Sequence, residues 1–588
     1  MTVASRRVLP GFGLGLGTTV LYLALMVLIP LGAAFWKAAG LGWGPFFDAI
    51  GSDRAIAAYA LTFQTAFLAA AINVVLGSIV AWTLVRYDFF GKSIIDALVD
   101  VPFALPTAVA GLVYAGLYVK QGWLGQFLVP LGFEAAYTKI GIVLVLVFTG
   151  FPFVVRTVQP VLEDIDRETE QAAETLGANR LQVLRRVILP VLVPPLITGF
   201  TLAFARAIGE YGSVIFISSN MPFETEIAPV LIVSRLEAFA YPEASAIAVL
   251  LLVVSFSLLA VINLAERWSQ PGSAPRLLRS AFAAFGRLGR SGWERLRPNR
   301  RAGTPEISPG LKLLFRTAPS AAIGATVLIV AVLIAVPLVN VFVQAFADGP
   351  ASYWNNLTGN GDTRHSIFLT LMVAPLAVAM NTLFGLAAAY TIARFRFPGR
   401  TTLTTLIDLP FSVSPVVAGL VFVLLFGLNA PLGAWLKSMG YQVLFAPPAL
   451  VLATAFVTFP FVARELIPVL EANGPEEELA ARSLGANGWQ MFWRITLPNI
   501  KWGLIYGVIL CNARALGEFG AIYVVSGRIG GKTDTMPLRV EKLLQEYNQP
   551  AAFALASVLT MMALITLAIK VIVERKIQNE KRPAVVVE

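Results

Sequence analysis

The sequence has very little cysteine, histidine or charge. Its 588 residues include one cysteine, Cys511, and one histidine, His365, and 14% are charged. A lone cysteine excludes an intrachain disulfide, and these two residues cannot supply a zinc site of the usual Cys/His composition. A soluble domain carries about 25% charged residues. We therefore expect no metal site and a packing role for Cys511, in a chain too poor in charge to be soluble.

A nucleotide-binding loop is also missing. The stretch GRIGGKT, residues 527–533, is similar to a phosphate-binding loop, but a Walker A loop has four residues between its first glycine and Gly-Lys-Thr. Here three residues intervene, Ser526 stands at the required glycine position, and no short strand precedes it. The sequence contains no other Walker A pattern. We expect no catalytic residues and no cofactor in this chain.

Long apolar runs are abundant instead. Hydrophobic residues make up 57% of the chain, and runs of about 20 residues, enough to cross a bilayer, recur without a polar face. They predict an all-α polytopic membrane protein. The first run could be a signal peptide after Arg6 and Arg7, but a matching run in mid-chain favours an uncleaved helix. The twelve predicted spans are 18–36, 61–85, 94–118, 139–159, 192–216, 245–265, 319–343, 367–392, 402–427, 447–467, 500–525 and 552–573.

The twelve spans form one six-span unit that occurs twice. Many residues recur 308 positions later, among them the pairs Asn73 and Asn381, Arg86 and Arg394, Gly177 and Gly485, Pro190 and Pro498, and Pro242 and Pro550. Six is an even number, so both copies enter and leave on the same side of the membrane. Parallel repeats in transporters are related by an axis along the membrane normal, and substrate passes at the repeat interface. The sequence therefore predicts two parallel six-helix repeats with a path between them.

The distribution of Lys and Arg predicts the orientation. They are more frequent in the loops that lie inside if the N-terminus is inside, which predicts a multi-pass protein of the bacterial cytoplasmic (inner) membrane with both termini cytoplasmic. The GRIGGKT loop then faces outward, away from cytoplasmic ATP. Its counterpart SNMPFET, residues 219–225, lacks the glycines and the lysine. Any ATPase must therefore be a separate protein.

A basic linker separates the two copies. We predict a first unit at 1–265, a cytoplasmic linker at 266–316 and a second unit at 317–588. The linker holds eleven Lys or Arg against three Glu. Its apolar residues suit a helix on the anionic inner leaflet, and a solvated tether fits equally well. Nucleic-acid binding is disfavoured, because membrane topology already predicts a basic cytoplasmic flank. The apolar residues are Leu278, Phe282, Phe285, Trp293 and Leu296.

A matched cytoplasmic loop follows the fourth span of each copy, within 160–190 and 468–498. The first contains QAAETLGANRLQVLRRVILP and the second LAARSLGANGWQMFWRITLP. Each predicts a short helix, a left-handed glycine stop and a second amphipathic helix that leads into the membrane. Pro475 and the three glutamates after it form a good helix opening. We call each short helix together with its glycine stop an elbow. The elbow residues are Ala172, Ala173, Leu176 and Gly177 in the first copy, and Ala480, Ala481, Leu484 and Gly485 in the second.

This loop pattern resembles the EAA loop of ABC importer permeases, the coupling helix that docks on the ATPase subunit. The resemblance implies two ATPase subunits, which would carry ATP and Mg. The family's glutamate is replaced by Gln171 in one copy and Leu479 in the other, while Glu170 and Glu478 lie one residue earlier.

The region around the fifth span of each copy narrows the resemblance. FARAIGEYGSVIFIS and NARALGEFGAIYVVSG resemble the T-type and W-type permease subunits, respectively, of the sulfate/thiosulfate ABC importer. The likeness covers about 60–264 and 365–573, and here the two subunits are joined in one chain. It implies sulfate import with a periplasmic sulfate-binding protein. Molybdate, ferric iron and thiamine stay open as substrates, and an ion-coupled carrier is the alternative without an ATPase.

Charged pairs and prolines mark the predicted path. Arg206 and Glu210, and likewise Arg514 and Glu518, are four residues apart within predicted spans. Charge in mid-membrane is costly, which favours an ion pair one turn apart; the other interpretation is contact between guanidinium and a passing oxyanion. Broken spans at corresponding positions indicate a pathway, although proline kinks also serve packing alone. The third and ninth spans are interrupted by Pro102, Pro106 and Gly111, and by Pro410, Pro415 and Gly419.

Overall fold

The computed structural model describes residues 9–269 and 309–581, and within these ranges every regular element is a helix. Nine of the described helices are long and apolar enough to cross a membrane, and three bent helix pairs raise the number of spans to as many as twelve. The all-α polytopic prediction is confirmed. The predicted unit boundaries next to 265 and 317 fall inside helices, and linker residues 270–308, with the predicted surface helix, lie outside the described residues.

The first unit begins with a long helix that is interrupted by a π-helical turn, and the remaining spans and their connections follow. Its elements are α1 (Phe12–Leu23), η1 (Ala24–Leu28), α2 (Ile29–Ala39), α3 (Trp43–Gly51), α4 (Asp53–Arg86), α5 (Lys92–Val99), α6 (Val101–Ala104), α7 (Thr107–Tyr118), α8 (Gly125–Leu128), η2 (Val129–Leu131), α9 (Lys139–Asp164), α10 (Arg167–Thr175), α11 (Arg180–Val183), η3 (Leu184–Ile188), α12 (Leu189–Ile208), α13 (Val214–Ile217), α14 (Ala228–Glu237) and α15 (Tyr241–Ser269).

The second unit repeats this order. Its elements are α17 (Pro309–Val330), η4 (Ala331–Ala335), α18 (Val336–Ala345), α19 (Pro350–Thr358), α20 (Gly361–Arg394), α21 (Arg400–Ser412), α22 (Pro415–Phe426), α23 (Pro431–Ser438), α24 (Pro447–Ala472), α25 (Glu476–Ser483), α26 (Gly488–Met491), η5 (Phe492–Thr496), α27 (Leu497–Leu516), α28 (Gly520–Ser526), α29 (Met536–Gln545) and α30 (Gln549–Lys581).

The third and ninth spans are sharply bent at matched places. The segment through α5 and α6 meets α7 at 109°, and α21 meets α22 at 103°. The break falls at Leu105 and Pro106 in the first unit and at Val413 and Ser414 in the second, where the backbone is extended. Proline has no N–H to continue the helical ladder. An interruption of each span is confirmed, but it falls at Pro106 and at its counterpart Ser414, and Pro415 begins the next helix. The other residues expected to interrupt these spans lie within helices: Pro102, Gly111, Pro410 and Gly419.

The fifth and eleventh spans end earlier than predicted. The sequence suggested continuous helices over 192–216 and 500–525, but α12 stops at Ile208 and α27 at Leu516, before the short helices α13 and α28. In the second unit the bend is 54°. Each span starts further back instead, at Arg180 and Gly488, through the π-helical turns η3 and η5. The prediction was wrong here because apolar composition continues through a backbone break.

The first helix of each unit packs against the other unit. Helix α1 lies along α20, where the Tyr22 hydroxyl donates to Asn381 Oδ1 at 2.7 Å and the Tyr22 ring stacks on Phe384. Helix α17 lies along α4, with the Thr83 hydroxyl 3.4 Å from the Ala322 carbonyl oxygen. Each unit therefore buries part of its surface under a helix from its partner, an exchange that the repeat pattern did not predict.

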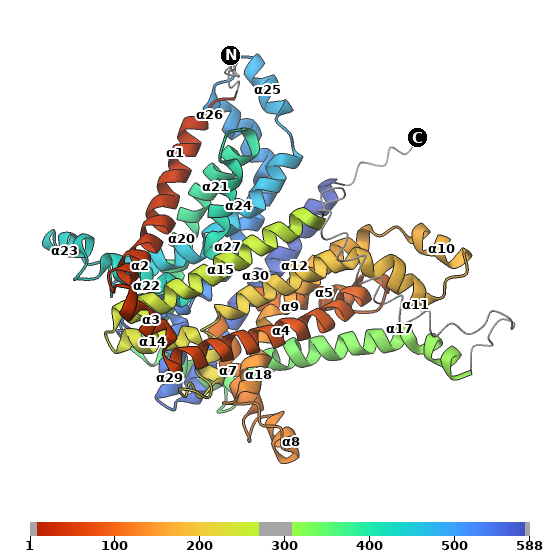
Figure 1. Cartoon of the computed structure of the whole chain (residues 1–588), viewed down its shortest axis with the longest axis horizontal. Helices are drawn as coiled ribbons and strands as arrows, with labels where there is room; N and C mark the ends of the chain where they lie inside the picture. The colour runs from red at the N-terminus through yellow and green to blue at the C-terminus, as the bar shows by residue number, and fades with distance from the viewer. Residues whose placement is uncertain (1–8, 270–308, 582–588) are drawn as a thin grey trace.

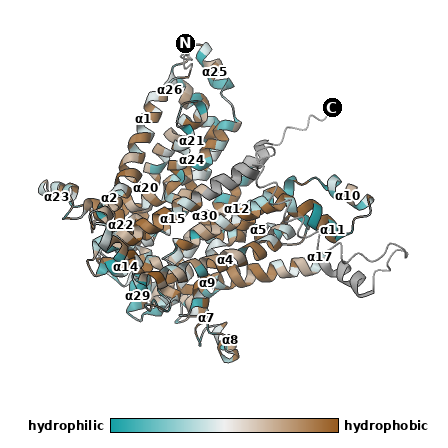
Figure 2. Ribbon diagram, viewed as in Figure 1, coloured by the Kyte–Doolittle hydropathy of each residue, from teal (hydrophilic) through white to brown (hydrophobic). Residues whose placement is uncertain are grey.

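The two units diverge from a common corner. Figure 1 shows α14 and α29 at this corner, one set of long helices extending toward α25 and α26, and another toward α10 and α11. Figure 2 shows hydrophobic residues along the long helices and hydrophilic residues at α10, α25 and the α14–α29 corner. The polar ends and the apolar lengths are those of a bilayer-spanning protein whose elbows are far apart.

Candidate functional site

The four backbone breaks meet between the units, near the corner. Gly209 lies against Ser414, whose hydroxyl donates to the Gly209 carbonyl oxygen at 2.9 Å. Gly517 lies against Pro106, so that an added Cβ on Gly517 would be 2.8 Å from the Pro106 Cα. These approaches between backbones are too close for a larger residue. The broken third span of each unit thus contacts the end of the fifth span of the other.

Two aromatic rings mark the axis between the units. Tyr211 and Phe519 occupy the same repeat position, 308 residues apart, and their rings stack on each other with centroids 6.0 Å apart and planes 16° apart. Both side chains are fully buried. Tyr523 and Phe216 pack around them, at 5.4 Å from Tyr211 and 5.7 Å from Phe519. Since equivalent residues of a twofold repeat meet only at its axis, this aromatic cluster lies on the axis, on the side of the corner.

The predicted Arg–Glu pairs lie directly beside these breaks. Arg206 Nη2 is 2.7 Å from Glu210 Oε2, and Arg514 Nη2 is 2.9 Å from Glu518 Oε2. Glu210 also accepts hydrogen bonds from the backbone N–H and hydroxyl of Ser213, and Glu518 accepts from the Ala521 N–H. Both carboxylates are buried, while the arginine side chains are 21% and 17% exposed. Each glutamate joins the end of one helix to the start of the next.

Polar contacts cover the cluster on the side of the α14–α29 corner. Arg528 Nη2 is 3.1 Å from Glu237 Oε1 of the other unit, and the Arg528 guanidinium lies 4.5 Å from the centre of the Tyr523 ring. Arg528 belongs to the GRIGGKT stretch, which folds on itself through a hydrogen bond of 2.7 Å from the Thr533 hydroxyl to the Ser526 carbonyl oxygen. The GRIGGKT stretch thus packs over the aromatic cluster at the axis.

Two carboxylates in this polar layer have raised pKa values. Burial, opposed by nearby basic side chains, raises the pKa of Asp534 to about 6 and that of Glu541 to about 7. A buried carboxyl disfavours its charged form because it loses hydration. The layer beside the GRIGGKT stretch thus contains acidic groups, which is unsuited to holding a phosphate.

The elbows at the far ends have the predicted local structure. Gly177 and Gly485, with φ of +83° and +90°, end α10 and α25. Leu176 and Leu484, just before them, are both 88% exposed. Asn179 and Asn487 then start the next helices with capping boxes. Ala172, Ala173, Ala480 and Ala481 lie on α10 and α25 themselves, so each elbow is a slim helix with an exposed leucine at its tip.

Two glutamates, each one residue before the glutamate position of the EAA loop, hold the elbows to the ends of α4 and α20. Glu170 pairs with Arg86 at the end of α4, and Glu478 pairs with Arg394 at the end of α20, with Arg394 Nε and Glu478 Oε2 2.8 Å apart. Sequence reasoning missed both pairs. The signal was available, because all four residues obey the same 308-residue offset.

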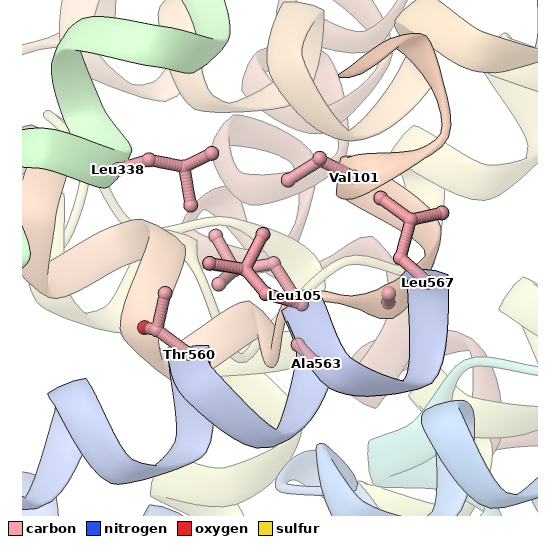
Figure 3. Close-up of a pocket in the computed structure, with 8 residues that line it drawn as sticks. Val101, Leu105, Leu338, Thr560, Ala563 and Leu567 are labelled. Atoms are coloured by element: carbon pink, nitrogen blue, oxygen red, sulfur yellow. The ribbon is translucent and has the colours of Figure 1, made fainter. Parts of the chain in front are cut away.

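A further ion pair joins the units and was not predicted. Lys570 Nζ of α30 is 2.5 Å from Asp100 Oδ2, and Arg156 Nε is 2.7 Å from Asp100 Oδ1. The neighbouring seam is apolar: Figure 3 shows Val101 and Leu105 of the first unit in a small pocket with residues of α18 and α30. The counterpart of Lys570 is Ile262, so the repeat gave no indication of this contact. The α18 and α30 residues labelled there are Leu338, Thr560, Ala563 and Leu567.

Metal ligation finds no support in the described ranges. Among residues 9–269 and 309–581, no three His, Cys, Asp or Glu side chains cluster to hold a metal ion. Cys511 is buried, and its Sγ lies 3.5 Å from the Thr458 carbonyl oxygen and 3.9 Å from Asn381 Nδ2. The cysteine thus packs within the second unit.

Comparison with known proteins identifies both units. Residues 73–274 and 381–579 each match the family described as the binding-protein-dependent transport system inner membrane component. The sulfate transport system permease protein CysW of Escherichia coli (strain K12) is 50% identical over 262 residues, which are 45% of this chain and 90% of that protein.

Two other relatives agree. The sulfate transport system permease protein CysT of Salmonella typhimurium (strain LT2) is 49% identical over 263 residues, covering 45% of this chain and 95% of its own length. Sulfate permease 2, chloroplastic, of Chlamydomonas reinhardtii is 47% identical over 320 residues, 54% of this chain and 82% of its own. The chain therefore belongs to the family of inner membrane components of binding-protein-dependent transport systems, and it carries the family's unit twice.

Proposed function

We propose that this protein is the membrane permease of an ATP-driven importer that brings sulfate, and also thiosulfate, into the cytoplasm. The proposal rests on one observation. The molecule has two matched elbows, and at the end opposite to them the axis between the units is closed by one aromatic cluster, Tyr211 with Phe519. The substrate comes from the relatives, whose names describe sulfate permeases.

Two copies of an ATPase subunit dock on the elbows from the cytoplasm. The slim helices α10 and α25 enter a groove on each subunit, and the exposed Leu176 and Leu484 bury their side chains there. ATP and Mg bind to the ATPase subunits, and a periplasmic sulfate-binding protein delivers the anion over the α14–α29 corner. Both chain termini are cytoplasmic in this arrangement.

The transport cycle exchanges the open side. In the present state the outer end is closed by the aromatic cluster and the inner ends are apart. When ATP draws the ATPase subunits together, the elbows approach and the breaks at Pro106 and Ser414 separate from Gly517 and Gly209. Sulfate then enters between the units and leaves inward when the elbows separate again.

The Arg–Glu pairs serve mainly as latches of the closed gate. Glu210 and Glu518 each hold both sides of a break, so loss of either pair frees the segment that carries Tyr211 or Phe519. The part-exposed guanidinium groups of Arg206 and Arg514 offer an oxyanion a weak, passing partner. Weak contact suits transport, because tight binding slows release.

Energetics favour a pump. Moving a dianion into a cell at about 100 mV, inside negative, costs about 4.6 kcal/mol before any concentration gradient. A channel would therefore let sulfate out. An ion-coupled carrier would meet the same cost without ATP, which makes ATP dependence the discriminating property.

The test is uptake of radiolabelled sulfate into proteoliposomes that contain this chain, its ATPase and its binding protein. We expect uptake that requires ATP, stops with vanadate, and is reduced by excess thiosulfate more than by molybdate. Uptake that persists without ATP would establish an ion-coupled carrier. Uptake of molybdate, ferric iron or thiamine in preference to sulfate would assign another substrate.

A further inference from the structure

Two short segments extend from opposite flanks of the molecule. The first, 119–138, lies between α7 and α9 and contains α8 and η2; the second, 427–446, lies between α22 and α24 and contains α23. We call them the outer arms. Their positions in the repeat match, and Figure 1 shows α8 and α23 projecting away from the body on opposite sides of the α14–α29 corner.

Each arm contains a tight backbone turn. An added Cβ on Gly125 would be 1.9 Å from the Val119 carbonyl oxygen, and one on its counterpart Gly433 would be 2.2 Å from the Gly427 carbonyl oxygen. The chain therefore folds back tightly on itself in both arms, at glycines 308 residues apart. The same compact turn on both flanks holds the exposed side chains in fixed positions.

The arms expose apolar and aromatic side chains and almost no charge. In the first, Phe127 is 67% and Leu131 81% exposed, and Trp123, Phe133 and Tyr137 are also exposed. The second exposes Leu428, Trp435, Met439, Tyr441 and Phe445. The charged residues are Lys120 and Glu134 in the first arm and Lys437 in the second. Such a surface is unfavourable in water.

The central outer loops have a different surface. Residues 527–535 alone carry Arg528, Lys532 and Asp534, and Arg528 forms an ion pair across the axis. The surface over the axis is therefore suited to water and to a charged partner protein. The lateral arms are suited to the lipid interface, where Trp and Tyr are enriched.

We propose that the outer arms lie in the bilayer interface, in the outer leaflet, as a pair of lateral anchors. The arms begin and end at the ends of spans, since α9 starts at Lys139 and α24 at Pro447. They are thus at the depth where a span leaves the hydrocarbon core. Placement of the arms in the outer leaflet rests on the orientation given under the proposed function. Their contact with lipid does not depend on it.

Each anchor connects to the gate through one short helix. Helix α7 runs from the break at Pro106 to the first arm, and α22 runs from Pro415 to the second. Twelve residues of helix, the length of each, span about 18 Å. The arms therefore hold the gate segments of the third and ninth spans against lipid while the inner ends move.

The test measures the environment of each arm directly. Cys511 is the only cysteine and is buried, so a Cys511→Ser background accepts single spin labels at Phe127→Cys and Trp435→Cys. Lys532→Cys, exposed over the axis, is the matched control. In liposomes we expect the two arm labels to relax faster with oxygen than with a water-soluble nickel chelate, and the control to show the reverse.

Three results would overturn the anchors. Arm labels as accessible to nickel as the control would place the arms in water, and labels inaccessible to both reagents would place them inside a protein contact. Labels that become immobile only when the binding protein is added would assign the arms to that partner. Because accessibility needs no transport, failure of sulfate uptake would leave this outcome unaffected, and failure of the anchors would leave uptake unaffected.

Discussion

At the scale of residues, Tyr211 and Phe519 are the pair that closes the axis in the proposed cycle. Their stacked rings are buried where equivalent residues of the two units meet. Arg206 and Arg514 have their charges balanced beside this seal by Glu210 and Glu518. The seal thus depends on shape, while the ion pairs hold in place the segments that carry it.

Removing both rings should open the seal. Truncating a buried aromatic residue to alanine costs about 3–5 kcal/mol, so Tyr211→Ala with Phe519→Ala should raise ATP-independent efflux of preloaded sulfate by an order of magnitude or more. The measurement is loss of label from proteoliposomes. Leu68→Ala with Leu376→Ala, a matched pair of exposed residues on α4 and α20, should leave efflux low. Equal efflux from both double variants would refute the aromatic seal.

Glu541 should make stability depend on pH. Burial and the nearby acidic groups Asp534 and Glu237 raise its pKa from 4.5 to about 7, against the opposing effect of Arg528 and Lys542. The folded state therefore retains a proton that the unfolded chain loses, and stability falls as pH rises from about 4.5 to about 7. A shift of this size corresponds to at most about 3 kcal/mol.

The Glu541→Gln variant removes this dependence. Its thermal midpoint should exceed that of the unmodified protein at pH 8 and match it at pH 4.5. Glu224→Gln, at an exposed outer position, should change neither value. A midpoint for Glu541→Gln at or below that of the unmodified protein at pH 8 would show that its charged form is not a burden on the fold.

At the scale of elements, the proposed function depends on the breaks and the elbows. Much of this could be predicted, because repetition at 308 residues made each glycine stop visible twice and placed a proline at or next to each break of the third and ninth spans. The elbows and the bends of the third and ninth spans follow from local chemistry. The ends of α12 and α27 could not be found from apolar composition. Gly209 and Gly517 follow the last residues of these helices, but the sequence on both sides of each glycine stays mainly apolar.

Contacts between the units were the least predictable. The packing of α1 on α20, the meeting of Tyr211 with Phe519 and the Asp100–Lys570 pair each join residues from different copies. A repeat pattern describes each copy by itself. It does not say which faces meet, and Lys570 has no equivalent in the first unit to attract notice.

The elbow glycines should be essential for coupling. Gly177 and Gly485 have positive φ values and no neighbour within 4 Å of an added Cβ, so Gly177→Val with Gly485→Val should strain the turn by about 1–2 kcal/mol per site without a steric clash. We expect the ATPase to dissociate during purification and ATP-dependent uptake to fall.

A matched control exists on the opposite side of the molecule. Gly132 and Gly440 have φ of +84° and equally open surroundings in the outer arms. Gly132→Val with Gly440→Val imposes the same backbone strain away from the elbows and should leave the ATPase bound. An intact, coupled complex in the Gly177/Gly485 double variant would count against the docking assignment.

At the scale of the whole molecule, the exchanged helices and the axis constrain the motion. Helices α1 and α17 each pack on the opposite unit, so the units move as interlocked bodies. In the proposed cycle, the close backbone contacts at Gly209 and Gly517 place the fulcrum near the α14–α29 corner. In that cycle, motion at the elbows is then the larger one, and ATP drives it.

The distance between the inner ends of α4 and α20 tests the central claim most directly. Asp88 and Arg396 follow these helices at equivalent positions and are exposed, so spin labels at Asp88→Cys and Arg396→Cys in the Cys511→Ser background report on the elbows. With the ATPase subunits bound, the account predicts that the distance shortens when ATP is added and lengthens again after hydrolysis. A distance that does not change with nucleotide would contradict it.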